Sequence, residues 1–147
     1  MKTTIELAAL ALVLSTAIPA AAQDAEPSIV GAWRMTSLEV QGADGTQAVI
    51  PYTGQLVFTE GGTLSVQAMD ANPQAAPTTY TVNGYEAYYG PVAIDNEKDV
   101  FTITVQSSLV RDLIGQQLSR NFEVTADNLV ITPVNAQEGW RVTYERF

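Results

Sequence analysis

The chain contains no cysteine and no histidine. These two absences exclude disulfides, thiol redox chemistry, a cysteine nucleophile, a Ser-His-Asp triad and a histidine-ligated zinc site. Carboxylates, tyrosines, arginines and very few lysines remain for acid or base chemistry. Most common hydrolase mechanisms are therefore ruled out, and we expect neither a metal nor any other cofactor.

Basic residues are also scarce, since 7 Lys and Arg stand against 16 Asp and Glu, for a net charge of −9. Nucleic acids and anionic membranes are bound through clusters of Lys and Arg, so both are poor candidates for partners, and we expect no nucleic-acid partner. The only lysine beyond Lys2 is Lys98, in the charged segment 95–99. That segment lacks the glycine and the distal glutamate of an EF-hand loop, so we read it as a solvated turn rather than a calcium site.

Long hydrophobic runs are missing except near the start of the chain. Residues 1–22 combine Lys2, an apolar stretch over 5–18 and three alanines before Gln23, the pattern of a secretory signal peptide cleaved after Ala22. We therefore expect a periplasmic or secreted protein with no stable membrane insertion after cleavage. Residues 23–30 form a flexible acidic lead in this reading, and residues 31–147 form one domain.

Short alternating segments fill that domain. Residues 32–40 alternate with period two, and 54–59 and 63–69 form a hairpin around Glu60-Gly61-Gly62. Further strands are expected at 100–107, 117–125, 129–133 and 140–146, and 48–52 is an optional one. Little helix is predicted beyond a short helix or bent loop at 109–115. The pattern is typical of an all-β fold, a single antiparallel up-and-down barrel of about eight strands.

Two segments interrupt the alternation. Residues 70–79 contain two prolines and no periodicity, which is typical of a lid or a mobile rim. Residues 83–90 are rich in tyrosine, and we expect one helical turn that runs into a strand ending at Ile94.

Six short motifs follow one another along residues 31–129. They are Gly31-x-Trp33, Gly54-x-x-x-Phe58-Thr59-x-x-Gly62, Ser65-x-Gln67-x-Met69, Tyr85-x-x-Tyr88-x-Gly90, Gly115-x-x-x-x-Arg120-x-Phe122 and Asp127-x-Leu129. In this order they resemble the bacterial and fungal lipocalin-like domain family. The resemblance implies a calycin-type barrel and no single activity. Members of that family often carry histidine in the strand that here reads 101–105, and this chain has none.

Candidate ligand contacts come from three places. Tyr85, Tyr88 and Tyr89 fit either the rim of a pocket or a packed plug at the barrel end, because a buried tyrosine must also satisfy its hydroxyl. Ser65, Gln67 and Met69 share one strand face, which lines a small cavity if it points inward and is a solvated surface if it points outward.

Arg120 is the third candidate, because an arginine that points inward needs an anionic partner, either internal or on a ligand. Trp33 is assigned a structural role, stacked under a guanidinium from the far end of the chain. Arg141 and Arg146 are the expected donors of that guanidinium.

Three functions remain open at this point. The leading one is an exported barrel that binds a small apolar or amphipathic molecule. The second is a small-barrel isomerase or cyclase, which requires a buried carboxylate such as Glu39 or Glu86 with a raised pKa beside a tyrosine hydroxyl. The third is a structural or protein-interaction module with a filled interior. The sequence indicates no oligomeric state.

Overall fold

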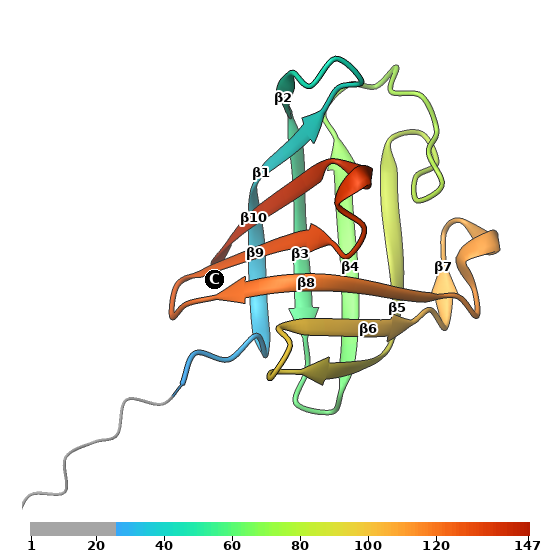
Figure 1. The fold of residues 1–147 in the computed structure, drawn as a ribbon. Helices are drawn as coiled ribbons and strands as arrows, with labels where there is room; N and C mark the ends of the chain where they lie inside the picture. The colour runs from blue at the N-terminus through green and yellow to red at the C-terminus, as the bar shows by residue number, and fades with distance from the viewer. Residues whose placement is uncertain (1–25) are drawn as a thin grey trace, which may run out of the picture.

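The computed structural model describes residues 26–147, so the predicted signal peptide and its cleavage site lie outside the described residues. Eight antiparallel strands close into a barrel, as predicted (Figure 1). The ring consists of β1 (Gly31–Gln41), β3 (Tyr52–Phe58), β4 (Thr63–Asp70), β5 (Tyr85–Asp95), β6 (Val100–Thr104), β8 (Gln117–Val124), β9 (Asn128–Pro133) and β10 (Trp140–Arg146).

Strand β1 closes the ring. Its first half pairs with β3, while β10 pairs along most of its length from Trp33↔Arg146 to Val40↔Trp140, with an irregularity between Met35 and Ser37. The optional strand at 48–52 is β2 (Gln47–Ile50), which pairs only with the second half of β1. β2 is therefore an addition to the ring and not one of its eight members.

The tyrosine-rich segment begins with a tight turn at Asn83 and Gly84, both at positive φ, and is extended from Tyr85 onward, so the expected helical turn is absent. β5 pairs with β4 over Tyr85–Pro91 and with β6 over Val92–Asp95. Its aromatic and β-branched residues suit a pleated strand. Gly90 is needed at the crossing, because a Cβ there would collide with the carbonyl oxygen of Thr104.

The remaining elements are short. β7 (Ser107–Ser108) pairs with Tyr88 and Tyr89, and η1 (Arg111–Leu113) lies in the segment expected to be a short helix or bent loop. A second 3-10 turn, η2 (Ala136–Glu138), precedes β10. In the part of the chain that the structure describes, no helix is both long and apolar enough to cross a bilayer.

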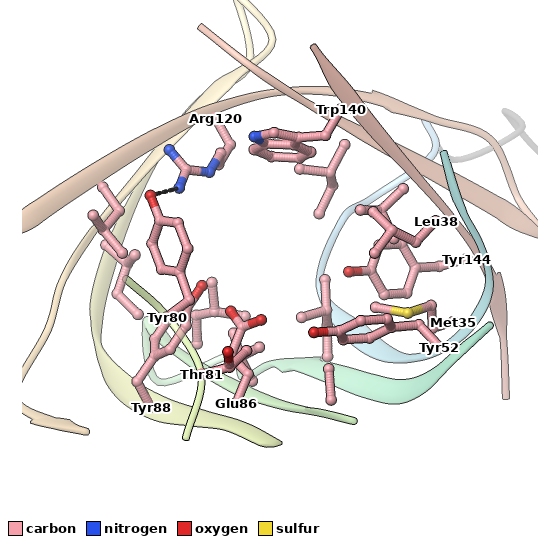
Figure 2. Close-up of a pocket in the computed structure, with 18 of the residues that line it drawn as sticks. Met35, Leu38, Tyr52, Tyr80, Thr81, Glu86, Tyr88, Arg120, Trp140 and Tyr144 are labelled. Atoms are coloured by element: carbon pink, nitrogen blue, oxygen red, sulfur yellow. Dashed lines mark hydrogen bonds between the residues drawn. The ribbon is translucent and has the colours of Figure 1, made fainter. Parts of the chain in front are cut away.

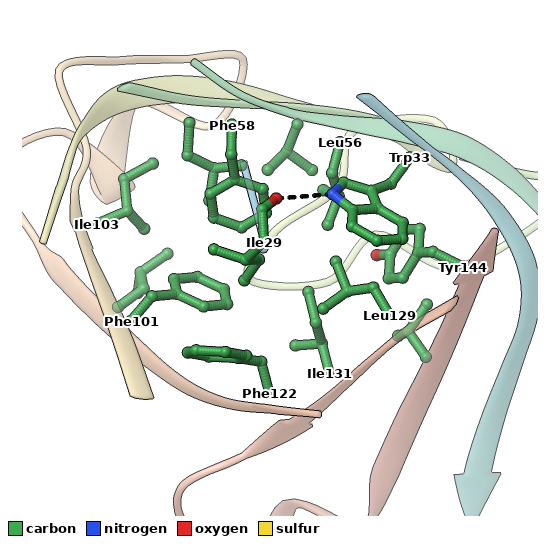
Figure 3. Packing of buried hydrophobic residues seen from close by; sticks show 14 of the residues in the cluster. Ile29, Trp33, Leu56, Phe58, Phe101, Ile103, Phe122, Leu129, Ile131 and Tyr144 are labelled. Atoms are coloured by element: carbon green, nitrogen blue, oxygen red, sulfur yellow. Dashed lines mark hydrogen bonds between the residues drawn. The ribbon is translucent and has the colours of Figure 1, made fainter. Parts of the chain in front are cut away.

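One end of the barrel is filled with large side chains (Figure 3). Trp33 is fully buried there, and Phe101 packs edge-on against Phe58 with ring centroids 5.2 Å apart. Phe122 and Leu129 complete the plug. Buried side chains from β1, β3, β6, β8 and β9 therefore meet and fill this end of the barrel.

Arg146 holds the same end from outside. Its guanidinium lies 3.9 Å from the centre of the Trp33 ring, so the expected stacking is present with Arg146 as the donor. Gly31 makes room for it, because a Cβ at this position would lie 2.5 Å from Nη1 of Arg146. Glycine at position 31 of the Gly31-x-Trp33 motif therefore allows Arg146 to pack against Trp33.

The acidic lead is not free over its last residues, in contrast to the expectation of a flexible segment. Ile29 is only 2% exposed, and its carbonyl accepts a hydrogen bond from Trp33 Nε1 at 2.8 Å. Arg146 donates to the carbonyls of Ser28 and Val30 at 2.7 and 3.0 Å. One apolar side chain and these backbone contacts anchor residues 28–30 to the barrel.

Candidate functional site

The other half of the barrel encloses a cavity of about 350 Å³. It lies toward the end that carries the β1–β2 turn and the β4–β5 connection (Figures 1 and 2). Its apolar wall consists of Met35, Leu38, Val40, Leu56, Leu64, Val66, Ala68, Phe101, Ile103, Leu118, Ile131 and Val142. Polar atoms enter it from Tyr52, Thr78, Thr79, Tyr80, Thr81, Glu86, Tyr88, Arg120, Trp140 and Tyr144.

The inner face of β4 is the apolar one. Leu64, Val66 and Ala68 are buried and line the cavity. Ser65, Gln67 and Met69 alternate with them and lie on the exposed outer face, where Gln67 accepts a hydrogen bond from Gln55 at 2.9 Å. The expectation that these three residues line the interior is therefore corrected, because burying the apolar set leaves the other set in water.

β5 divides the three tyrosines between its two faces. Tyr85 and Tyr89 are 37% and 43% exposed and lie outside the cavity, so they do not form its rim. Tyr88 lies on the inner face beside Glu86, and both line the cavity. Of the three tyrosines expected at the pocket, only Tyr88 lines the cavity, because residues an odd number of positions apart on a strand point to opposite faces.

Arg120 points into the cavity from β8, as expected for a ligand contact (Figure 2). Its Nη2 donates to the Tyr80 hydroxyl at 3.0 Å, and its Nη1 donates to the Ser119 carbonyl at 2.8 Å. The guanidinium also lies 5.1 Å from the centre of the Trp140 ring. Over residues 26–147 no carboxylate lies within 4.0 Å of it, so an anionic or carbonyl oxygen of a ligand has donors to meet.

Glu86 is the carboxylate of the cavity. Burial raises the pKa of this carboxyl from 4.5 to about 7, although hydrogen bonding by Tyr88 and the positive charge of Arg120 act in the opposite direction. Burial and the nearby Glu86 also raise the pKa values of the Tyr88 and Tyr144 hydroxyls. Glu39, the other acid considered from the sequence, lies outside this cavity, opposite Arg141 on β10.

Several residues that line the cavity were not predicted from the sequence. Tyr52, Trp140 and Tyr144 stand at strand positions where alternation alone did not mark them as special. Tyr80 follows the connection predicted as a rim, and its contact with Arg120 spans 40 residues. The adjacent turn is held by a pair of threonines, in which Thr78 N donates to Thr81 Oγ1 at 3.0 Å. Tyr80 could have been suggested as a lining residue by its position shortly before the tyrosine-rich strand β5.

Arg141 does not share the Trp33 contact assigned to it as an alternative. Its side chain is exposed and lies beside an outer groove that also includes Glu39 and Gln47. The charged turn at 95–99 is closed by a 2.7 Å ion pair between Lys98 and Asp95. Within residues 26–147 no three His, Cys, Asp or Glu side chains are grouped so as to hold a metal ion.

A closed eight-stranded antiparallel barrel with an internal cavity is the architecture of lipocalins and of other small ligand-holding barrels. A family model described as a lipocalin-like domain matches residues 30–144. The chain belongs to this family. A crystal structure of a lipocalin-like protein from Bacteroides uniformis ATCC 8492 is similar in fold, with a TM-score of 0.51 and 14% sequence identity. The similarity covers 81% of this chain and 98% of that one. A search of curated proteins finds no match.

Proposed function

We propose that this protein binds a small apolar or amphipathic molecule inside the barrel. The observation that carries the proposal is the cavity of about 350 Å³, with its apolar wall and its few polar groups. Ligand sites commonly have volumes of about 300–1,000 Å³ and this mixture of surfaces. The alternative of a filled, purely structural barrel does not agree with the open half of the interior.

The distribution of polar groups suggests how such a molecule is oriented. The apolar body of the ligand would contact Met35, Leu38 and Leu56, and an oxygen of the ligand would accept hydrogen bonds from Arg120. Burying about 300 Å² of apolar ligand surface at about 25 cal/mol per Å² corresponds to about 7 kcal/mol before ordering costs.

The test is a fluorescence titration with N-phenyl-1-naphthylamine, an uncharged probe that brightens in apolar surroundings. Ala68→Leu fills the cavity from the inner face of β4, and Gln67→Leu adds the same side chain one residue away on the outer face. We expect Ala68→Leu to weaken probe binding at least tenfold and Gln67→Leu to leave it unchanged.

Equal affinities in the two variants would place the probe on the surface and contradict the proposal, as would the absence of binding by the wild type. Thermal unfolding of both variants serves as the control for folding. Native mass spectrometry of the wild-type protein, purified gently from its own source, would then show whether a small molecule remains bound.

We also propose that the protein acts outside the cytoplasm, which is supported by the signal-like composition of residues 1–22. Cell fractionation followed by N-terminal sequencing of the mature protein tests this. A mature chain that begins at Gln23 in the periplasm or the medium is the expected result, and an intact chain in the cytoplasm would contradict it.

A further inference from the structure

We propose that the cavity catalyses proton transfer on an enolisable carbonyl compound, with the Glu86 carboxylate as the base and Arg120 and Tyr80 as the donors that hold the carbonyl oxygen. The inference rests on the proposed function, because the substrate must first enter the barrel. It goes further by assigning a reaction and a substrate class to the same cavity.

The position of Glu86 is the first argument. Of the described residues that line the cavity, it is the one carboxylate, and it projects from the inner face of β5 (Figure 2). No Lys or Arg nitrogen of residues 26–147 lies within 4.0 Å of it, so no ion pair neutralises it. A half-buried carboxylate that lines the cavity, hydrogen-bonded by Tyr88 and paired with no cation, can take a proton from a bound molecule.

The Arg120–Tyr80 pair is the second argument. Tyr80 accepts a hydrogen bond from Arg120 at 3.0 Å, so its own hydroxyl proton remains available to a ligand. Hydrogen bonding to a cation polarises a hydroxyl and makes it a stronger donor. Together with the unused guanidinium N–H groups, it provides donors for an oxygen that gains negative charge, as in an oxyanion hole.

The reaction requires no further reactant. Glu86 removes the proton from the carbon next to the carbonyl group, and the C–H electron pair forms a C=C bond while the carbonyl π electrons move to oxygen. Arg120 and Tyr80 stabilise the resulting enolate. The protonated Glu86 then returns the proton, either to the same carbon or, in a β,γ-unsaturated ketone, to the γ-carbon. The second route gives the conjugated isomer with all atoms conserved.

The acidity of the group agrees with this role. A general base is most effective when its pKa lies near the working pH. Burial raises the pKa of Glu86 to about 7, so near neutral pH a large fraction of the carboxylate is ionised, and its conjugate acid is able to return the proton. An ordinary exposed glutamate, with a pKa near 4.5, is a much weaker base.

The experiment measures exchange of the α-protons of 2-tetralone in D₂O by ¹H NMR, with wild type, Glu86→Gln and Glu123→Gln. Glu86→Gln keeps the size of the side chain and removes the base. Glu123→Gln removes the same charge from an exposed position on β8 and is the matched control. We expect wild type and Glu123→Gln to accelerate exchange equally, and Glu86→Gln to lose at least 100-fold of the acceleration.

Binding of 2-tetralone is followed in parallel by intrinsic tryptophan fluorescence, since Trp140 lines the cavity. Binding without Glu86-dependent exchange would overturn the inference and leave the proposed function intact. Failure of 2-tetralone to bind would overturn it as well, and the proposed function would fall only if N-phenyl-1-naphthylamine also does not bind. If Glu86→Gln does not fold, Glu86→Met, which removes the carboxylate and keeps a side chain of similar length, replaces it, and a wild-type rate in that variant contradicts the inference.

Discussion

The half-buried carboxyl of Glu86 inside the barrel makes the stability of the protein depend on pH in a defined direction. The unfolded chain releases this proton near the ordinary pKa of 4.5, whereas the folded protein keeps it until about pH 7. Between these two values the folded state binds one proton more than the unfolded state. The free energy of unfolding therefore falls as the pH rises through this interval, and the stabilisation is complete only below about pH 4.5.

The size of the effect follows from the same shift. Each pH unit in the interval lowers the free energy of unfolding by about 1.4 kcal/mol, and water in the cavity offsets part of the total, so we expect a loss of about 2 to 3 kcal/mol between pH 4.5 and 8. The groups that face Glu86 add no slope here. Arg120 remains charged throughout, and burial keeps the pKa values of Tyr88, Tyr144 and Tyr52 above their usual value of 10.0.

The assay is urea denaturation at pH 4.5, 6, 7 and 8 with wild type, Glu86→Gln and Glu123→Gln. Differences between proteins cancel the contributions of the other titrating groups. The free energy of unfolding of wild type minus that of Glu86→Gln should fall by about 2 to 3 kcal/mol between pH 4.5 and pH 8. Glu123→Gln should run parallel to wild type. If the Glu86→Gln and wild-type curves are parallel, the carboxyl is solvated and the reasoning is refuted.

Two further predictions concern the plugged end of the barrel, and thermal unfolding measures both. Gly31→Ala places a Cβ 2.5 Å from Arg146 Nη1 at a φ of 135°, while Gly45→Ala at a φ of 82° meets nothing within 4 Å. We expect Gly31→Ala to lower the free energy of unfolding by at least about 1 kcal/mol more than Gly45→Ala does. Equal losses of stability would show that the clash with Arg146 is relieved. Arg146→Met removes the stacking on Trp33 and three hydrogen bonds to backbone carbonyls, so we expect a loss of about 2 to 3 kcal/mol, against less than about 1 kcal/mol for Arg34→Met, whose ion pair is exposed. A larger loss in Arg34→Met would contradict this assignment.

The barrel itself could be predicted from local patterns. The Glu60-Gly61-Gly62 hairpin lies where expected, since Gly62 adopts a φ of 77° that other residues avoid. The resemblance predicted that an arginine near the end of the chain stacks on Trp33, but it did not distinguish Arg141 from Arg146, which the structure identifies as the donor. The extended conformation at the start of β5 could not be predicted in this way, because local propensity does not include the pairing of this segment with β4.

The cavity was predictable only in part, because period-two alternation fixes which residues share a face but not which face is inside. On β5 one face carries Tyr85 and Tyr89 and the other carries Glu86 and Tyr88, so hydrophobicity does not distinguish them. The Arg120–Tyr80 contact joins a strand to a distant connection, and no local pattern encodes such a pair.

The double pairing of β1 has a consequence for how the chain folds. β1 is the first strand of the described chain and pairs with β10, the last, through more than half of its residues, at sequence separations of 100 to 113 residues. Every other neighbouring pair of strands in the ring is closer in sequence, so these pairs can form early in folding. The β1–β10 pairing, which we call the seam, forms later because it closes a long loop at a high entropic cost. Until the seam forms, β1 and the far edge of the growing sheet expose unpaired backbone groups, which invite association between molecules. Slow closure at this seam is therefore the step at which destabilised variants would aggregate.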